Sequence, residues 1–162
     1  MSAARGNLGE AAVLHAFVRT GFQVLQPFGE GHPYDVVVHA DDAFIRVQCK
    51  TAWARAGCLV FNARATDHGH GQLSYEGRAD VFGVYFPVNE QVYLVPVGSL
   101  RTECRLRLVP TRNNQARRVR FAADYEIERW SAESLVEAVT TGRCQPPRDA
   151  TPLALISGSR VG

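Results

Sequence analysis

The sequence predicts an α/β domain in which helices cover a β-sheet. An amphipathic helix pattern at residues 8–19 is followed by two alternating strand patterns at 34–39 and 44–50. A further pair of strand patterns, at 81–86 and 91–96, is joined by a short turn-like segment. At 162 residues, the chain is long enough to bury a core of this kind.

The predicted helix at residues 8–19 carries a carboxylate within its apolar stripe. At about 100° per residue, Glu10 projects on the same side as Val13 and Phe17. Burying a lone carboxylate is costly unless it is paired, bound to a metal or protonated. We therefore expect a cation beside Glu10, supplied either by a metal ion or by the ammonium of Lys50.

The two strand patterns at residues 34–39 and 44–50 are joined by only four polar or small residues, so they must be antiparallel neighbours. This pairing brings Asp35 to the same end of the hairpin as Gln48 and Lys50. Side chains alternate along a strand, so Gln48 and Lys50 share one face. We expect the intervening Cys49 to pack into the core on the other face.

Lys50 is the single lysine in a chain with seventeen arginines. Arginine is essentially always charged, whereas lysine is a compact point charge whose pKa can shift. An arginine would serve equally well as a solvated surface charge. The retention of one lysine beside a carboxylate therefore indicates a chemical role.

These residues resemble a known signature. Glu10 on a helix, Asp35 after a Gly-Pro-containing loop, and Gln48-Cys49-Lys50 on the next strand are similar to the PD-(D/E)XK nucleases, with glutamine at the D/E position. Four later segments resemble the group I intron-associated branch, and they are residues 75–85, 92–97, 112–116 and 121–125. Archaeal-type Holliday junction resolvases share the same layout and are the nearest alternative.

The resemblance implies a restriction-endonuclease-like core, with a central mixed β-sheet flanked by helices, and a metal-dependent DNA endonuclease that hydrolyses phosphodiester bonds. Glu10, Asp35, Gln48 and Lys50 would be catalytic. Glu10, Asp35 and the Cys49 backbone carbonyl would hold Mg²⁺, which prefers oxygen ligands, and Mn²⁺ would substitute for it. Gln48 brings no negative charge, which leaves open whether one or two ions bind.

Arginines are concentrated in residues 101–120, where seven of them face a single acid, Glu103. Such a patch would contact DNA phosphates, and Asn and Gln side chains can also read base edges. A solvated arginine face and an asparagine-supported turn are the alternatives. The predicted DNA-binding residues are Arg112, Asn113, Asn114, Gln115, Arg117, Arg118 and Arg120.

The remaining chain is predicted to complete one nuclease domain over residues 1–142. Residues 57–62 are expected to form a third central strand, and 64–80 a long polar loop. A capping-box sequence starts a helix that ends near residue 140. Residues 143–162 are predicted to be a tail, docked or flexible.

Composition and hydropathy predict the cellular location of the protein. The chain is 46% hydrophobic and 21% charged, has no stretch of transmembrane length, and starts without an apolar signal region. We therefore expect a cytoplasmic protein with no membrane contact, encoded by a bacterium, an archaeon or a phage. The four scattered cysteines are expected to be reduced.

The favoured function is a site-specific double-strand DNA endonuclease of the intron-homing type. The alternatives are a junction resolvase that cuts four-way DNA and a non-catalytic DNA-binding module on a nuclease fold. Both enzymatic functions require a homo-oligomer, a homodimer or homotetramer, because two strands must be cut and each chain carries one site.

Overall fold

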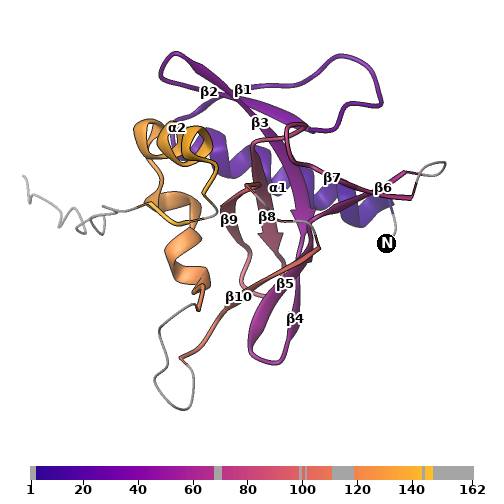
Figure 1. Cartoon of the computed structure of the whole chain (residues 1–162), viewed down its shortest axis with the longest axis vertical. Coiled ribbons are helices and arrows are strands. Elements are labelled where there is room, and N and C mark those ends of the chain that lie inside the picture. Colours follow the sequence, from indigo (N-terminus) through magenta and orange to yellow (C-terminus); the bar gives the residue numbers. More distant parts are fainter. Residues whose placement is uncertain are drawn as a thin grey trace, which may run out of the picture.

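The computed structural model describes residues 3–67, 71–98, 100, 102–110, 119–143 and 145–147. In this part of the chain the largest sheet has five strands in the order β1-β2-β3-β8-β9 (Figure 1). Neighbouring strands are antiparallel except β3 and β8, which are parallel, so the sheet is mixed. The strands are β1 (Gln23–Leu25), β2 (Val36–Ala40), β3 (Ala43–Thr51), β8 (Val81–Phe86) and β9 (Gln91–Pro96).

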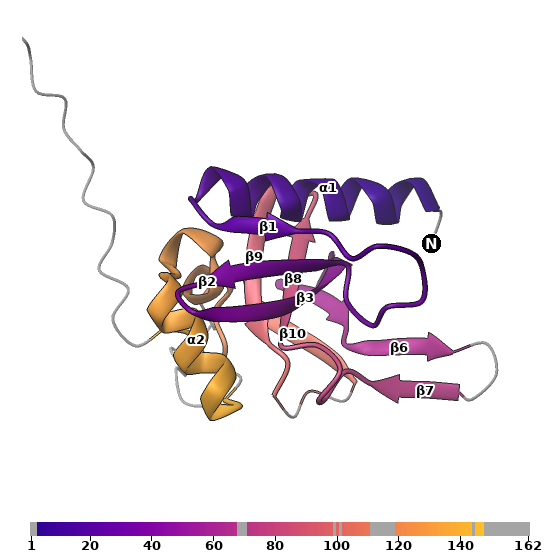
Figure 2. The ribbon, with the colours of Figure 1, turned by 90° about the horizontal axis from the view of Figure 1, so that it is seen from above.

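Two smaller sheets and the helices surround this central sheet. Figure 2 shows α1 and α2 on opposite sides of the β2–β3 hairpin. One small sheet has the order β10-β5-β4, and the other is the pair β6–β7. These elements are α1 (Ala3–Arg19), β4 (Trp53–Arg55), β5 (Cys58–Asn62), β6 (Arg64–Asp67), β7 (Gly71–Ser74), β10 (Glu103–Arg107), the 3₁₀ turns η1 (Ala122–Tyr125) and η2 (Ile127–Arg129), and α2 (Ala132–Thr141).

The predicted α/β class and the antiparallel hairpin are confirmed. Val36 of β2 lies opposite Val47 of β3, and the strands remain paired to Ala40 and Ala43. The two-residue turn between them has Asp41 in the left-handed region, at φ 52°. Aspartate tolerates that conformation better than most residues, which fits the tight turn.

Two predictions along the chain were wrong. The strand at residues 57–62 does not join the central sheet, because β5 pairs with β4 and β10 instead. Leu59 and Phe61 of β5 are fully buried. Phe61 packs edge-on against Phe82 of β8. The segment 64–80 is not a loop throughout, since it contains the paired strands β6 and β7. That hairpin is polar, so it lacks the apolar alternation that predicts strands.

Helix α1 packs very closely on the central sheet, and this contact sets the position of Glu10. A Cβ at Gly83 of β8 would lie 2.6 Å from Cγ1 of Val13 and 3.1 Å from Cγ1 of Val47. A Cβ at Gly9 would overlap the hydroxyl of Thr51. The helix begins at Ala3 rather than at the predicted residue 8. The sequence pattern missed its first turns because they are exposed and carry no apolar stripe.

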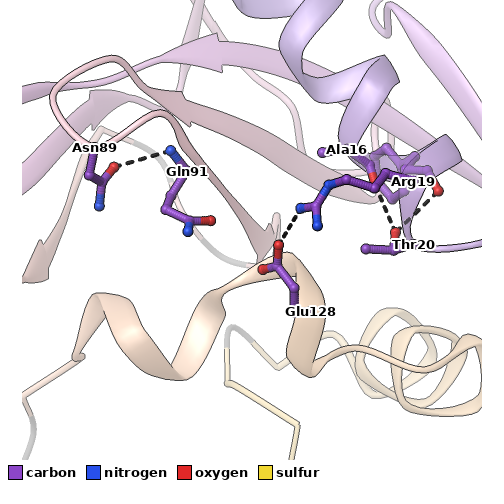
Figure 3. A network of polar contacts seen from close by, with 7 residues as sticks. Ala16, Arg19, Thr20, Asn89, Gln91 and Glu128 are labelled. Atoms are coloured by element: carbon purple, nitrogen blue, oxygen red, sulfur yellow. Dashed lines mark hydrogen bonds and ion pairs between the residues drawn. The ribbon is translucent and has the colours of Figure 1, made fainter. Parts of the chain in front are cut away.

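The carboxyl end of α1 is fixed to the 3₁₀ segment that precedes α2. Figure 3 shows the Arg19 guanidinium directed at the carboxylate of Glu128 in η2, and the Thr20 hydroxyl donating to the carbonyl of Ala16. Helix α2 begins at the predicted capping box, in which the side chains of Ser131 and Ser134 accept reciprocal backbone N–H bonds. The packing of α1 therefore depends on the close contact at Gly9 near its start and on the Arg19–Glu128 ion pair at its end.

The close approach of α1 to the sheet gives a stability prediction. Gly83→Ala should lower the free energy of unfolding by about 1–3 kcal/mol, because an added methyl group overfills the contact with Val13. Gly6→Ala is the control, since a Cβ there meets nothing within 4 Å. Denaturant unfolding of both variants measures the difference, and an unchanged midpoint for Gly83→Ala would contradict the close packing.

Candidate functional site

The β2–β3 hairpin joins Asp35 to the end of β3, as the sequence predicts. The Asp35 N–H donates to the carbonyl of Val47 at 2.9 Å, which extends the ladder by one residue. Its carboxylate oxygen Oδ2 accepts two bonds, from Gln48 Nε2 at 2.6 Å and from the Cys49 N–H at 2.7 Å. Burial raises the pKa of Asp35, against the lowering effects of the Cys49 N–H, the Lys50 charge and the Gln48 amide.

Glu10 of α1 faces Asp35 across a cleft of about 390 Å³. The remaining lining residues belong to the segment between β1 and β2, and they are Gln26, Pro27, Gly29, Glu30, Gly31, His32 and Tyr34. Glu10 is half-buried at the edge of the apolar stripe rather than inside it, beside the buried Gly9. Burial and the negative charge of Asp35 both raise the pKa of Glu10. The two carboxylates therefore repel each other across the cleft, and a cation between them would relieve that repulsion.

Lys50 does not supply that cation through direct contact. Its Nζ donates to the backbone carbonyl of Arg64 at 3.2 Å and to the hydroxyl of Tyr75 at 3.1 Å. Among the described residues, no ion pair joins Lys50 to Glu10 or Asp35. Burial lowers the pKa of Lys50 to about 8, although the charge of Asp35 opposes this shift. Of the two cations expected beside Glu10, Lys50 therefore makes no direct contact with it.

The amide of Gln48 lies between two oxygens that the sequence assigns to a metal. Its Nε2 donates to Asp35 Oδ2 and also, at 3.3 Å, to the carbonyl of Cys49. The amide N–H group of Gln48 therefore occupies the position between these two oxygens to which a cation would be attracted. Rotation of the amide would present its oxygen instead of its nitrogen.

The donor set suits a hard divalent cation. Carboxylates from Glu10 and Asp35, the Cys49 carbonyl and the Gln48 amide oxygen are all oxygen ligands of the kind that Mg²⁺ takes. Besides Glu10 and Asp35, the Glu30 carboxylate and the His32 ring line the same cleft. Backbone carbonyls, the Gln48 amide, water or substrate could supply further ligands.

Cys49 packs beside this site rather than deep in the core. It is half-buried and contacts the edge of the hydrophobic cluster, and burial raises the pKa of its thiol well above the ordinary value. Cys49, Cys58 and Cys104 form no disulfide with one another, and Cys144 is outside the described residues.

Most of the predicted DNA-binding residues are outside the described part of the chain, and these are Arg112, Asn113, Asn114, Gln115, Arg117 and Arg118. Of that set only Arg120 is described, and its carbonyl accepts the N–H of Arg107 at 2.7 Å. Of the predicted tail at residues 143–162, only 143 and 145–147 are described.

Several other arginines are engaged in structural contacts. Arg46 forms a two-pronged bond with Asp80, through Nε at 3.0 Å and Nη2 at 2.9 Å, which links β3 to the segment before β8. Glu103 of β10 accepts from both Arg55 and Arg105, and these bonds lower the pKa of Glu103. Arg46 and Arg55 are therefore less available for phosphate contacts than their charge alone suggests.

Two features of the site were missed by the sequence analysis. The segment between β1 and β2 forms most of the cleft wall, and Tyr75 contacts the Lys50 ammonium. Two prolines and two glycines within residues 27–33 indicated a loop but not its position over Glu10. Tyr75 begins one of the segments that resemble the family, but nothing local indicates its contact with Lys50, because that contact joins residues 25 positions apart.

Comparison with known proteins decides the family. The sequence model of the PD-(D/E)XK endonucleases matches residues 2–128, most of the chain. This chain belongs to the PD-(D/E)XK endonuclease family. Nucleases of this family generally use divalent metal ions, which agrees with the oxygen donors described above. No match was found among curated protein sequences.

The fold of this PD-(D/E)XK endonuclease is similar to that of the bacterial homing endonuclease I-Ssp6803I. The two chains superpose with a TM-score of 0.60 at 22% sequence identity, over 87% of this chain and 95% of the other. The restriction-endonuclease-like class, a mixed sheet flanked by helices, is thus confirmed. No helix in the described part of the endonuclease is both long and apolar enough to cross a lipid bilayer.

The lowered pKa of Lys50 predicts how stability varies with pH in the metal-free protein. Because the folded pKa of about 8 lies below the unfolded value of 10.5, the unfolded chain holds an extra proton between these pH values. The free energy of unfolding of the wild type should therefore rise with pH across this window, relative to Lys50→Met, by at most about 1.4 kcal/mol per pH unit.

Denaturant unfolding with a chelator present, at a series of pH values, measures this difference. Below pH 8 the two proteins should show a constant difference, since Lys50 is charged in both states of the wild type. Parallel curves through the whole window would show that Lys50 is not dehydrated in the fold.

Proposed function

We propose that this chain is a metal-dependent DNA endonuclease that cuts duplex DNA at specific sites, of the intron-homing type. The observation that carries the proposal is the hydrogen-bonded junction of Asp35 with Gln48 and Cys49, facing Glu10 across one polar cleft. The family match supports hydrolysis of DNA. The resemblance of the fold to a bacterial homing endonuclease supports the homing type over other nucleases.

The residues of the cleft would divide the chemistry among them. Glu10, Asp35 and the Cys49 carbonyl would hold Mg²⁺, and Mn²⁺ would substitute for it. When bound, the ion supplies Lewis-acid polarisation of the phosphate and a lowered pKa for a coordinated water. The carboxylates would orient that water for attack on the phosphorus atom in line with the leaving oxygen.

Lys50 would act on the phosphate and on the attacking water. As an ammonium, it would stabilise the negative charge that develops on the phosphoryl oxygens. With a pKa of about 8, roughly a tenth of Lys50 is neutral at pH 7, and this fraction would be able to accept a proton from the water. Arginine would remain charged under the same conditions, so it could do only the first of these.

The DNA path is proposed to continue from the cleft to the arginine-rich segment. The segment between β1 and β2, the β6–β7 hairpin and the start of α1 gather at one end of the molecule (Figures 1 and 2). A duplex bound at this end would meet the catalytic cleft. Arg112, Arg117, Arg118 and Arg120 would contact phosphates, and Asn113, Asn114 and Gln115 would read bases. Double-strand cleavage would need two sites, hence a homodimer or homotetramer.

Gln48 supports a second, non-catalytic candidate. A DNA-binding module on a nuclease fold would lack acidic metal ligands, and Gln48 stands where the family signature has an acid. The two carboxylates that face each other at Glu10 and Asp35 favour catalysis instead, because their mutual repulsion has no function in a binding module.

Cleavage of three substrates tests these candidates. The purified protein is incubated in Mg²⁺ with a plasmid, a random linear duplex and a synthetic four-way junction, and the products are separated on a gel. Discrete duplex cuts would support the homing type, and cuts at the junction alone would indicate a resolvase. Binding without cleavage, in Mg²⁺ and in Mn²⁺, would leave only the DNA-binding module.

Substitution of the site residues separates chemistry from binding. Asp35→Ala and Lys50→Ala should each reduce the cleavage rate by about a hundredfold or more, as expected for the loss of a transition-state contact, and should leave the Kd for DNA nearly unchanged. Lys50→Arg should also fail, because a planar guanidinium cannot take the place of a point ammonium and is harder to deprotonate.

The matched control is Asp42→Ala, which removes an exposed carboxylate from the opposite end of the same hairpin. Single-turnover cleavage and a separate binding titration measure the two properties. Near wild-type cleavage by Asp35→Ala or by Lys50→Arg would show that the site has been assigned wrongly.

Gln48→Glu should strengthen metal binding, by at least about tenfold, because it adds a negative charge beside Asp35 and Glu10. The same substitution should lower the Tm of the metal-free protein, since it replaces the bond from Gln48 Nε2 with repulsion between carboxylates. Calorimetric titration with Mg²⁺ and thermal unfolding in a chelator measure the two effects. Gln91→Glu, on β9, adds the same charge elsewhere, and equal metal affinity in both variants would place Gln48 outside the metal site.

A further inference from the structure

The ammonium of Lys50 is held by Tyr75, which is not one of the catalytic signature residues Glu10, Asp35 and Gln48-Cys49-Lys50. A lysine side chain has four rotatable carbon–carbon bonds, so an unrestrained ammonium samples a large volume. Here Nζ donates to the Tyr75 hydroxyl at 3.1 Å and lies 4.5 Å from the centre of the Tyr75 ring. The distance to the ring is within the range of a cation–π contact.

Tyr75 is itself rigidly supported. Its side chain is only 6% exposed, and its ring packs edge-on against Phe82 of β8, with centroids 5.5 Å apart. Phe82 in turn packs against Phe61 of β5. The Tyr75 carbonyl accepts the N–H groups of Arg78 and Ala79, both at 2.9 Å, which pins the backbone as well. The tyrosine hydroxyl is therefore a stationary anchor point.

The arrangement leaves part of the ammonium available to substrate. Lys50 has three N–H donors. Among the described residues, two of them are used, by the Tyr75 hydroxyl and by the backbone carbonyl of Arg64 in β6. A third donor remains for a phosphoryl oxygen or a water. Both anchors are electrically neutral, so the positive charge of the ammonium is not cancelled by an ion pair.

We propose that Tyr75 is a positioning residue, whose hydroxyl and ring hold the Lys50 ammonium at the point where the scissile phosphate binds. This proposal rests on the proposed function. Tyr75 would not contact the reacting atoms, and its effect would reach them through Lys50 alone. Loss of the anchor would slow the chemical step and leave DNA affinity intact.

The single lysine of the chain makes the anchor directly observable. Labelling the protein with ¹³C,¹⁵N-lysine gives one set of side-chain resonances, which belong to Lys50. Spectra of the metal-free protein are recorded at a pH more than one unit below the pKa of Lys50. In the wild type, the Cε resonances should be displaced from those of a free lysine and should show restricted motion.

Two variants divide the contact into its parts. Tyr75→Phe keeps the ring and its packing on Phe82 but removes the hydroxyl, and Tyr75→Leu removes the ring as well. The Lys50 resonances should shift partly towards free lysine in Tyr75→Phe and almost fully in Tyr75→Leu. Tyr93→Phe is the control, because Tyr93 is equally buried and its hydroxyl also accepts a bond, from Asn89 at 2.9 Å. Tyr93→Phe should leave the Lys50 resonances unchanged.

Cleavage kinetics supply the second readout. The single-turnover rate of Tyr75→Phe should fall about tenfold or more, the order expected for the loss of a hydrogen bond to a charged group, with Kd for DNA unchanged. Tyr93→Phe should cut at the wild-type rate. Partial loss of rate in Tyr75→Phe and greater loss in Tyr75→Leu would follow the loss of order at Lys50.

The proposal is overturned if the Lys50 resonances are the same in Tyr75→Leu and the wild type, or if the rate of Tyr75→Phe is unchanged. It is also overturned if the loss lies in DNA affinity rather than rate, because that would make Tyr75 a DNA contact. Failure of the proposed function is distinguishable. If the wild type does not cut DNA, the catalytic proposal fails, whereas the NMR comparison still decides whether Tyr75 holds Lys50.

Discussion

The structure of the site depends on one interaction, the acceptance of two N–H donors by a single carboxylate oxygen. Asp35 Oδ2 binds the Cys49 backbone and the Gln48 side chain, at the point where the β2–β3 ladder ends. These bonds orient the carboxylate where it lines the cleft. Because charge-assisted bonds of this kind are short and directional, the main chain itself sets the position of Asp35. The other site residues are placed relative to it.

Helix α1 completes the site because glycines let it approach the sheet. Gly9 and Gly83 leave no side chain in the contact, so Glu10 is brought to the same cleft as Asp35. Burial, and with it the repulsion between these carboxylates, raises the pKa of Glu10. The packing that brings Glu10 to Asp35 therefore also produces repulsion between their carboxylates, and a bound cation would reduce that repulsion. Such a site is stabilised by its ligand, since only the folded state brings the two charges together.

The basic residues serve different physical roles in this fold. Arg46 and Arg55 make bonds that join elements of the fold, so their charges are partly neutralised by Asp80 and Glu103. Lys50 is half-buried near carboxylates, and within the described part of the chain its ammonium bonds to two neutral groups. Burial can lower the pKa of a lysine to about 8, whereas arginine keeps its proton under any such condition. This difference gives a physical reason for one lysine in an arginine-rich chain.

The sequence by itself determined the α/β class and the hairpin that joins Asp35 to Gln48, because hydrophobic alternation and short turns are local patterns. It also determined the family signature, which depends only on residue identities and their order. Tertiary structure alone decided that β5 pairs with β10, since a strand buried on all sides has the same composition in either sheet. It also decided the direction of the Lys50 ammonium. That direction depends on Arg64 in β6 and Tyr75 just after β7, which are distant along the chain and meet Lys50 only when the β6–β7 hairpin has folded beside β3.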